Sequence, residues 1–451
     1  MPEKPIIAKR VRGGAKIDHC KNTKHITTDV MPTPKKVVIP MRQHIGAPCA
    51  VAVKVGDEVK KGTVIGTVTA AVCAPVHSSV SGKVTKIYEA TVADGSKIMS
   101  VEIESDGLDT VDENIKPPQI DTVEGFIEAV KNSGLVGLGG AGFPTHIKLM
   151  QNPDKPIDTL IINCAECEPY ITSDHRECIE DSWDILNGIY TVIRLLGIPK
   201  AYIAVEDNKP DVIKTLLSIA GDEQYDPEDR VKVVELKSMY PQGAEKVMVK
   251  AVTGKEIPVG KLPADVGVML MNVTTVAFIS RYFKTGMPLI SRRVTVDGGV
   301  VRNPRNIIVP IGASVADLLK FVGLNDEPTK IIMGGPMMGT AISTDEVPVT
   351  KTTNAVLAFN RKEAATVKTT ACIRCGRCVK NCPMGLVPLR IAEAAMCGEA
   401  DELRQLNIAA CMECGTCVYN CPAGRHLVQA IRMGKRKVRE DDMKKKEAEK
   451  K

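Results

Sequence analysis

The sequence is poor in aromatic residues, which make up 3% of its 451 residues and include one tryptophan, Trp183. Proteins that bind single-stranded nucleic acid stack bases on aromatic side chains, so this scarcity argues against that function. The formal net charge is only +6, and residues 435–451, with nine Lys or Arg and five Asp or Glu, account for +4 of it. The rest of the chain is close to neutral, and we expect no nucleic-acid partner.

Long apolar segments are also missing. The first 20 residues contain no apolar core of signal-peptide length, and no later segment approaches the roughly 20 apolar residues of a spanning helix. The longest apolar stretch, residues 266–279, is interrupted by Asn272, Thr274 and Thr275. We therefore expect a chain that is neither secreted nor transmembrane. The basic tail, residues 435–451, is expected to be a frayed helix or a disordered, solvated arm.

The remaining composition, 44% apolar and 25% charged, is typical of globular proteins, and the length suits about three domains. Residues 1–115 alternate apolar and polar positions between turn signals, which predicts a small β domain. Its segments VGDEVKKGTVIG (55–66) and APVHSSVSGKV (74–84) resemble lipoyl and biotinyl carrier domains, which are barrel-sandwich folds. The hairpin at residues 75–78 has no lysine to carry a modification, so we expect a structural or docking role.

After a linker at residues 115–118, strands and helices alternate. The pattern predicts an α/β layer domain over residues 116–290, because short apolar strands are separated by helices of ten to fifteen residues. Residues 291–350 contain two β segments around a turn at Asp297-Gly298-Gly299 and then one helix, which predicts a compact β-grasp-like insert. Residues 351–434 are expected to be helical and rich in cysteine. The predicted elements of the α/β layer are a helix at 122–132, a strand at 160–163, a helix at 181–196 and a strand at 201–205.

Nine of the 15 cysteines lie between Cys372 and Cys421. In a chain without a signal peptide, clustered cysteines favour metal ligands over a disulfide framework. They form a repeat in which three cysteines at two-residue gaps precede a Cys-Pro pair, and the whole pattern recurs 39 residues later, from Cys372 to Cys411. The two-residue gaps let one loop turn three thiolates toward a single centre.

Three cysteines in one loop and a distant fourth before proline are typical of two-cluster ferredoxins, in which the fourth cysteine binds the other cluster. Structural zinc sites are the alternative, but they usually use pairs of cysteines. For Cys164, Cys167 and Cys178 we expect free thiols, with a third metal site as the alternative, and for Cys397 we expect a buried thiol. No ligand role is established for Cys20, Cys49 and Cys73. The predicted ligand sets of the two [4Fe–4S] clusters are Cys372, Cys375, Cys378 and Cys421, and Cys382, Cys411, Cys414 and Cys417.

Residues 137–142 match the G-x-G-x-x-G pattern of dinucleotide-binding loops. The context differs, because the preceding segment, 123–132, has helical spacing where that fingerprint needs a strand. Pro144 can begin a helix, and the glycines would expose backbone N–H groups near its positive end. We expect a ligand with a phosphate group and a nearby planar ring at this loop. A purely structural turn is the alternative.

Four segments, in order, resemble the flavin domain of the NADH-binding subunit of respiratory complex I: GGAGFPT-x-x-K (139–148), NCAECEP (163–169), YPQGAE (240–245) and NVTT (272–275). Residues 292–322 are similar to the soluble-ligand-binding β-grasp domain of that subunit. The complete domain order resembles the C subunit of the Rnf complexes, which are membrane-bound ferredoxin:NAD⁺ oxidoreductases that translocate Na⁺ or H⁺.

This resemblance implies a Rossmann-like α/β domain that binds FMN and NAD(H). It also implies a peripheral position on the cytoplasmic face of the membrane, with other Rnf subunits as partners, including a ferredoxin-like iron–sulfur subunit and membrane subunits. The residues that this resemblance assigns to FMN binding are Gly139, Gly140, Gly142, Lys148, Asn163, Glu166, Gly243, Asn272 and Thr275. Those that it assigns to NADH binding are Phe143, Glu168 and Glu245.

Nicotinamide carries two electrons as a hydride, whereas an iron–sulfur cluster accepts one, so a flavin between them is the expected converter. Hydride transfer needs no general acid or base, and we predict no catalytic side chain. Two other enzymes share these modules: a cobalamin-reducing protein, which would place the carrier-like domain last, and a flavin subunit of a soluble NAD-linked hydrogenase or formate dehydrogenase, which would lack that domain. A non-enzymatic electron-transfer adaptor is the alternative from another class.

Overall fold

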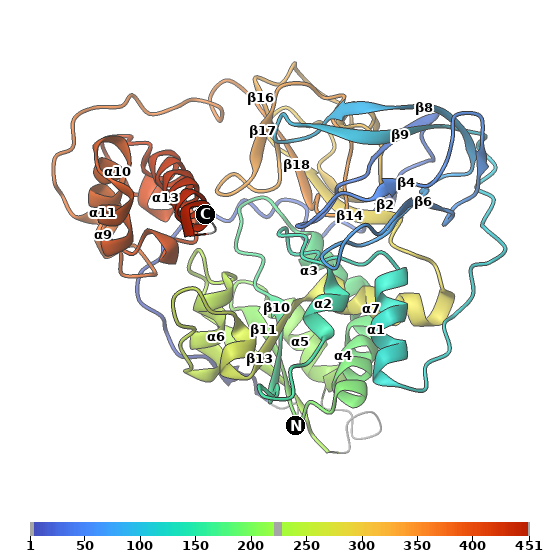
Figure 1. Cartoon of the computed structure of the whole chain (residues 1–451), viewed down its shortest axis with the longest axis horizontal. Helices are drawn as coiled ribbons and strands as arrows, with labels where there is room; N and C mark the ends of the chain where they lie inside the picture. The colour runs from blue at the N-terminus through green and yellow to red at the C-terminus, as the bar shows by residue number, and fades with distance from the viewer. Residues whose placement is uncertain (1–3, 221–227, 450–451) are drawn as a thin grey trace.

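The structure is a computed structural model that describes residues 4–220 and 228–449. The first three residues of the predicted N-terminal domain and the last two of the predicted tail lie outside the described residues. Figure 1 shows three domains packed around one another, with the cysteine-rich helices standing to one side at the end of a long connection.

Residues 4–35, which we call the N-terminal strap, join the other domains. Strand β1 (Ile6–Ile7) pairs in parallel with β12 (Val231–Leu236), and β2 (Asp29–Val30) pairs in parallel with β15 (Arg305–Pro310). Between them, Ala15 forms an antiparallel bridge with Tyr240. The predicted N-terminal β domain, residues 1–115, includes these residues, and their two short strands lie at the edges of two other sheets. Such long-range pairing leaves no local sequence pattern.

The barrel sandwich contains two antiparallel sheets, β3-β9-β8-β5 and β4-β6-β7, whose first strand begins at Lys36. The hairpin at residues 75–78 is buried against its neighbours. The fully buried Lys351 donates from Nζ to the carbonyl oxygens of Pro75, at 2.6 Å, and Gly134, at 2.7 Å, and so ties three domains together. The hairpin therefore serves as a docking element. The strands are β3 (Lys36–Pro40), β4 (Ala50–Val51), β5 (Glu58–Val59), β6 (Val64–Thr67), β7 (Val76–His77), β8 (Gly82–Thr91) and β9 (Lys97–Ser105).

The α/β domain is built on a five-stranded parallel sheet in the order β1-β12-β11-β10-β13. The predicted helices are confirmed, one with Thr122 as its N-cap and one ended by Gly197 in the left-handed conformation. The chain passes from β10 to β11 and β12 on one side and then returns to place β13 on the other side of β10. The elements are α1 (Val123–Asn132), β10 (Thr159–Cys164), α3 (Ser173–Glu180), α4 (Ser182–Leu196), β11 (Ala201–Glu206), α5 (Pro210–Ala220), α6 (Glu245–Thr253), β13 (Val268–Asn272) and α7 (Val273–Thr285).

The β-grasp insert contains a six-stranded sheet in the order β17-β16-β18-β14-β15-β2. Strand β18 (Ala355–Phe359) lies in its centre, parallel to β14 and antiparallel to β16, and is buried throughout. This strand lies beyond residue 350, the predicted end of the insert, and its short apolar segment is recognisable only by its distant partners. The other elements are β14 (Ser291–Asp297), α8 (Val315–Val322), β16 (Lys330–Met333) and β17 (Thr340–Ile342).

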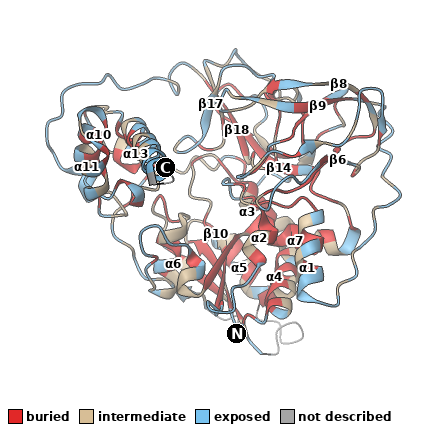
Figure 2. Ribbon diagram, in the orientation of Figure 1, coloured by how far each residue is buried: buried red, intermediate tan, exposed pale blue. Residues whose placement is uncertain are grey.

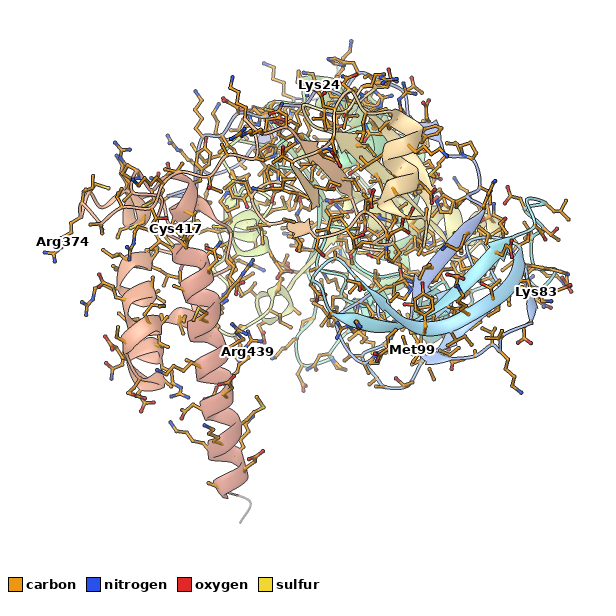
Figure 3. All side chains as sticks on the ribbon, turned by 90° about the horizontal axis from the view of Figure 1, so that it is seen from above. Lys24, Lys83, Met99, Arg374, Cys417 and Arg439 are labelled. Carbon is orange, nitrogen blue, oxygen red and sulfur yellow. The ribbon has the colours of Figure 1, made fainter. Side chains whose placement is uncertain are left out.

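The C-terminal domain is helical, and its longest element, α13 (Leu427–Glu449), has 23 residues. The expected frayed or disordered tail is the second half of this helix up to Glu449, where Arg404 forms ion pairs with Asp441 and Asp442. Figure 2 shows the exposed outer face of α13, and Figure 3 shows the helix projecting from the body. Within residues 4–220 and 228–449, no helix combines the length and the apolar character that crossing a bilayer requires. The other helices are α9 (Arg377–Lys380), α10 (Pro388–Cys397), α11 (Ala400–Gln405) and α12 (Thr416–Tyr419).

Candidate functional site

The predicted flavin residues gather at the carboxyl ends of β10 and β13. These neighbouring strands are parallel, and Asn163 and Asn272 are register partners at their ends. From β10 the chain continues to β11 and β12 on one side of the sheet and later returns to place β13 on the other side, so the connections change direction between β10 and β13. Open α/β sheets bind ligands in the crevice outside the strand ends at such a switch in connection.

The glycine loop packs against the beginning of α7. The amide of Leu138 donates to Oγ1 of Thr275 at 2.9 Å, and a Cβ on Gly139 would lie 3.2 Å from the Cβ of Asn272. Asn272 is the N-cap of α7 and accepts from the amide of Thr274 at 3.0 Å. Pro144 does precede a helix, α2 (Thr145–Leu149), but that helix has only five residues. The long helix whose N-terminus packs against the glycine loop is therefore α7.

The tip of the loop presents backbone donors to solvent. Within the described parts of the chain, the amides of Gly139, Gly140 and Ala141 donate no hydrogen bond, and all three residues are exposed. Gly140 has a φ of +114°, and a Cβ at this position would have no atom within 4 Å, so glycine is required by its backbone and not by crowding. Consecutive free amides form a site for an anion.

Three further segments meet beside this loop. Asn163 donates from Nδ2 to the carbonyl of Gly243 at 2.9 Å, which joins the end of β10 to the turn before α6. Lys148 is half-buried and donates to the carbonyl of Leu270 at 2.9 Å. Burial lowers the pKa of Lys148, and the nearby carboxylate of Glu245 opposes this shift. The structure therefore brings together these four segments, which are far apart in sequence.

Glu166 caps helix α3. Its Oε1 accepts from the amide of Asp174 at 2.6 Å and its Oε2 from that of His175 at 3.3 Å. Burial raises the pKa of Glu166 to about 7, although Lys21, with Nζ 3.9 Å from Oε2, opposes the shift. The carboxylate of Asp174 in turn accepts from Asn272, at 2.7 Å, and from Thr274. The sequence analysis did not identify Asp174. Its position in the first turn of a helix is the only sequence feature that could have indicated it.

Lys21 was also missed. This half-buried residue of the N-terminal strap donates from Nζ to the carbonyl oxygens of Glu166 at 2.7 Å, Glu168 at 2.9 Å and Ile171 at 2.5 Å. It thus fixes the backbone of the segment that carries two predicted ligand residues. Its own sequence, KNTKH, contains no signal for this role.

Glu168 contacts the β-grasp domain at residues 335–337. Its Oε2 accepts from the amide of Met337 at 3.0 Å, whereas its Oε1 is buried and has no hydrogen-bond partner among the described residues. Burial raises the pKa of Glu168 to about 7. Phe143, the other predicted NADH residue of this region, is half-buried, and its carbonyl closes the glycine loop by accepting from Gly137 at 2.8 Å. One oxygen of Glu168 is thus buried without a hydrogen-bond partner among the described residues.

The eight repeat cysteines line two separate cavities. In both loops the residue two positions after the first cysteine has a positive φ, 54° at Arg374 and 59° at Glu413, and its amide donates to the sulfur of that cysteine at 3.4 Å. The two halves of the repeat therefore share one backbone conformation. We call the cavity of Cys372, Cys375, Cys378 and Cys421 the outer centre and the cavity of Cys382, Cys411, Cys414 and Cys417 the inner centre.

The inner centre contacts the α/β domain, which we call the flavin-type domain because it contains the residues predicted to bind FMN. The hydroxyl of Tyr240 donates to the carbonyl of Cys414 at 2.7 Å, and a Cβ on Gly415 would lie 3.1 Å from the carbonyl oxygen of Met337, whose amide binds Glu168. Cys414 and Cys417 are buried. Figure 3 shows Cys417 on the side of the main body and Arg374, from the outer centre, at the far end.

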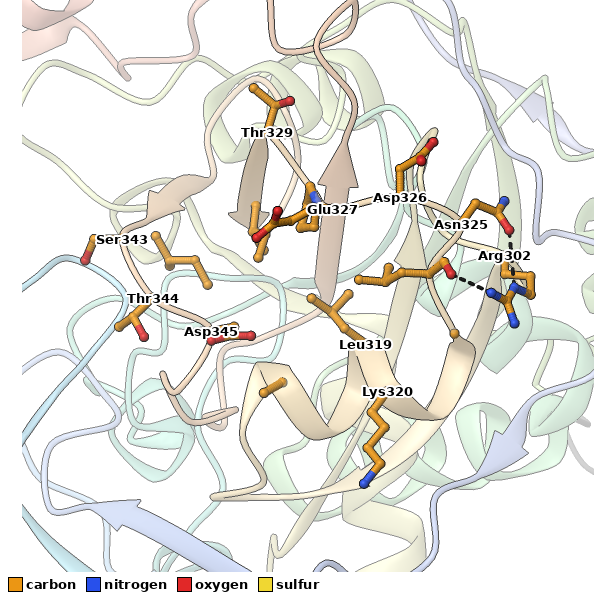
Figure 4. A pocket seen from close by; sticks show the side chains of 16 residues that line it. Arg302, Leu319, Lys320, Asn325, Asp326, Glu327, Thr329, Ser343, Thr344 and Asp345 are labelled. Atoms are coloured by element: carbon orange, nitrogen blue, oxygen red, sulfur yellow. Dashed lines mark hydrogen bonds between the residues drawn. The ribbon is translucent and has the colours of Figure 1, made fainter.

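A further cavity, of about 940 Å³, lies on the β-grasp domain beside α8. Figure 4 shows charged residues of both signs around it, and Arg302 is hydrogen-bonded to Asn325 and to the backbone of Leu324. None of the residues predicted for flavin, nicotinamide or iron–sulfur binding lines this cavity.

Four family models match successive parts of the chain. They describe the RnfC barrel sandwich hybrid domain at residues 9–108, the Nuo51 FMN-binding domain at 130–281, the SLBB domain at 293–341 and a 4Fe-4S dicluster domain at 357–426. The predicted order of barrel-sandwich, flavin-type, β-grasp and iron–sulfur domains is confirmed. The NAD⁺-reducing [NiFe]-hydrogenase in its H₂-reduced state is a solved structure that aligns with a TM-score of 0.49 and 18% identity, over 68% of this chain and 63% of that chain.

Curated relatives match over most of their length. The C subunit of the Na⁺-translocating ferredoxin:NAD⁺ oxidoreductase complex of Acetobacterium woodii is 44% identical, over 90% of this chain and 91% of the relative. The corresponding subunit of the proton-translocating complex of Clostridium ljungdahlii is 41% identical, over 84% and 83%. The C subunit of the ion-translocating oxidoreductase complex of Rhodobacter capsulatus is 37% identical, over 97% and 84%. This chain therefore belongs to the family of C subunits of the ion-translocating ferredoxin:NAD⁺ oxidoreductase, or Rnf, complexes.

Proposed function

We propose that this chain is the peripheral NADH, FMN and iron–sulfur subunit of a membrane-bound ion-translocating ferredoxin:NAD⁺ oxidoreductase. It would exchange hydride with NAD(H) and single electrons with a ferredoxin-like partner subunit. The observation that carries the proposal is the direct contact between the flavin-type domain and the inner centre, in which Tyr240 donates to the carbonyl of Cys414. Met337 of the β-grasp domain makes a second, indirect connection, because its amide donates to Glu168 and its carbonyl lies beside Gly415. A flavin in the crevice would then lie next to a one-electron acceptor.

We assign the α/β domain, residues 116–290, to the Rossmann-like class. The parallel order β12-β11-β10-β13 supports this assignment, because it places the third, second, first and fourth strands of the domain side by side. The limits of the neighbouring domains are proposed at residues 36 and 360, so that the strap is separate and β18 belongs to the β-grasp domain.

The residues of the crevice fit FMN. The free amides of Gly139, Gly140 and Ala141 would bind its phosphate, a negatively charged group that such backbone donors favour. FMN, when bound, supplies conversion between hydride transfer and single-electron transfer. The other residues proposed to line it are Gly142, Lys148, Asn163, Glu166, Gly243, Asn272 and Thr275.

For NADH we propose Phe143, Glu168 and Glu245. The unpartnered oxygen of Glu168 would accept a hydrogen bond from the nucleotide, which removes the cost of leaving this atom buried without a partner. Glu245 lies in the first turn of α6 and interacts electrostatically with Lys148. The two carboxylates therefore approach the crevice from different segments.

Each cavity of four cysteines is proposed to hold one [4Fe–4S] cluster with crossed ligation. The fourth cysteine of each repeat lines the cavity of the other repeat, which is the arrangement of two-cluster ferredoxins. The inner centre contacts the flavin-type domain, whereas the outer centre has two exposed cysteines, Cys372 and Cys375. We therefore propose that electrons pass between the flavin and the partner subunit through the inner centre and then the outer centre. The partner complex would hold the chain at the cytoplasmic face of the membrane.

Anaerobic purification, followed by iron, sulfide and flavin assays and then by NADH addition, tests the proposal. We expect about eight iron atoms and one FMN per chain, with bleaching by NADH. Clusters without flavin in the wild-type protein would contradict the assignment and support the adaptor alternative.

A matched pair of variants tests the phosphate cradle. Gly140→Asp places a carboxylate among the free amides and is expected to abolish flavin binding while the iron content stays unchanged. Gly95→Asp is the control, because Gly95 also has a positive φ, of 81°, with no atoms within 4 Å, but belongs to the barrel sandwich. Flavin binding that survives Gly140→Asp would contradict the assignment of this loop.

A further inference from the structure

The barrel sandwich contains a buried group of metal-ligating side chains that belongs to neither iron–sulfur centre. His44 follows β3, Cys49 precedes β4, and Cys73 lies between β6 and β7. The sulfur atoms of Cys49 and Cys73 are 3.5 Å apart, and the sulfur of Cys73 is 3.7 Å from Nε2 of His44. All three ligand atoms lie within 4.8 Å of one another, and all three residues are buried.

We propose that His44, Cys49 and Cys73 bind one zinc ion. Zinc takes cysteine sulfur at about 2.3 Å and histidine nitrogen at about 2.0–2.1 Å in tetrahedral geometry. Two sulfur ligands of such an ion are then roughly 3.8 Å apart, and a sulfur and a nitrogen ligand roughly 3.6 Å apart. The two distances in the structure differ from these values by only a few tenths of an ångström. Three protein ligands leave the fourth position to water.

The ligand atoms also form hydrogen bonds with the neighbouring backbone. Nδ1 of His44 lies 3.2 Å from the carbonyl of Ile45, to which it can donate, and this tautomer leaves Nε2 with a free electron pair. That atom accepts from the amide of Ala74 at 3.1 Å, and the Cys49 thiol donates to the carbonyl of Ala74 at 3.1 Å. On binding, both thiols release their protons and the ion replaces these two hydrogen bonds.

The charges of the site also suit a divalent cation with two thiolates. Zn²⁺ and two thiolates sum to zero, so no net charge is added to the buried interior. Lys351, whose ammonium group interacts electrostatically with Cys49 and Cys73, donates to Pro75 and Gly134 and stays paired with those carbonyl oxygens. A zinc ion with two thiolates is therefore compatible with this neighbour.

The position of the site gives the ion a structural role. The amide of Ile45 donates to the carbonyl of Gly142 at 3.1 Å, and the Cα of His44 lies 3.5 Å from the Cβ position of Gly142. An ion that fixes residues 44–49 would thus hold the back of the glycine loop. This consequence rests on the proposed flavin function, whereas the metal site itself does not.

The test is zinc and iron analysis of the anaerobically purified full chain. We expect one zinc per chain beside the cluster iron in the wild-type protein. Cys49→Ser/Cys73→Ser should lose the zinc and keep the iron, and Cys20→Ser/Cys397→Ser, which changes two cysteines outside all three sites, should keep both. After zinc is exchanged for Co²⁺, a cobalt–thiolate absorption band should be present in the control and missing from the double variant.

Several outcomes would overturn the site. They are wild-type protein without zinc that also fails to bind added Co²⁺, zinc that persists in the Cys49→Ser/Cys73→Ser variant, and a disulfide between Cys49 and Cys73 in anaerobically alkylated protein. If the double variant does not fold, His44→Gln replaces it, with the same expected loss of zinc. Zinc bound at one per chain in protein without flavin would uphold the site and contradict the proposed function.

Discussion

The two halves of the cysteine repeat share a sequence pattern and a backbone conformation but lie in different surroundings. Cys414 and Cys417 of the inner centre are buried, whereas Cys372 and Cys375 of the outer centre are exposed. Packing outside the repeat causes the difference, since Tyr240 binds the carbonyl of Cys414. Local spacing thus determines that a centre forms, and tertiary contacts determine what it can reach.

Equivalent positions of the two loops also differ in charge. Arg374 and Arg377 of the outer loop correspond, 39 residues later, to Glu413 and Thr416 of the inner loop. Thr416 is fully buried and accepts from the sulfur of Cys414 at 3.3 Å, while Arg374 and Arg377 line the outer cavity. The outer centre is therefore rimmed by cations, which favour an acidic electron-transfer partner.

The largest expected effect is the loss of one centre alone. Replacing Cys421 with Ala removes a predicted ligand of the outer centre, although Cys421 belongs to the second half of the repeat. We expect the outer cluster to be damaged, with roughly half of the iron lost and the inner cluster intact. Iron analysis and electron paramagnetic resonance of the reduced protein measure this.

Cys397→Ala is the control for that variant. Cys397 is exposed at the end of α10, so the prediction of a buried thiol was wrong, and this residue lines neither cavity. Both clusters should remain. Damage confined to the inner cluster in Cys421→Ala would mean that each repeat binds its own cluster, and the crossed assignment would be wrong.

The next effect concerns the charged rim of the outer centre. Arg374→Gln/Arg377→Gln is expected to slow electron exchange with an acidic ferredoxin by on the order of tenfold at low ionic strength, and less at high salt. Reduction of the protein by NADH should not change. Stopped-flow kinetics across a salt series measure both steps. Lys54→Gln/Lys83→Gln, on the barrel sandwich, is the charge-matched control, and an equal slowing there would contradict a specific docking surface.

The sequence predicted what depends on local pattern. The cysteine spacing, the helices at 122–132 and 181–196 and the domain order needed only neighbouring residues or a resemblance. The contacts of Lys21, the central place of β18 and the ion pairs of Asp441 and Asp442 on α13 depend on partners far along the chain. Sequence periodicity contains no information about such partners, so the surroundings that distinguish the two centres were not predictable.

A smaller effect is expected at the contact between the inner centre and the flavin-type domain. Tyr240→Phe removes the hydrogen bond to the carbonyl of Cys414 and leaves a buried acceptor without a partner, at a cost of about 1–3 kcal/mol. The reduction potential and magnetic resonance spectrum of the inner cluster should shift, while those of the outer cluster stay unchanged. Redox titration followed by magnetic resonance measures this, with Tyr88→Phe as control. A shift confined to the outer cluster would invert our assignment of inner and outer.

The smallest effect concerns the pH dependence of stability. We expect it to come from buried carboxyl groups near the inner centre, above all from Glu168. Burial raises the pKa of Glu168 from 4.5 to about 7, against hydrogen bonds from the amides of Met337 and Met338. Between these two pH values the folded protein keeps a proton that the unfolded chain releases, so stability falls as the pH rises.

Glu168→Gln should remove this contribution, so that the loss of thermal stability between pH 5 and pH 8 becomes smaller but does not vanish, since burial also raises the pKa of Glu166 to about 7. Anaerobic thermal melting at both pH values measures the change. Glu124→Gln, in the exposed first turn of α1, is the control and should retain the wild-type dependence. An unchanged slope in Glu168→Gln would mean that Glu168 is already ionised at pH 5, and that the amides of Met337 and Met338 outweigh the effect of burial on its carboxylate.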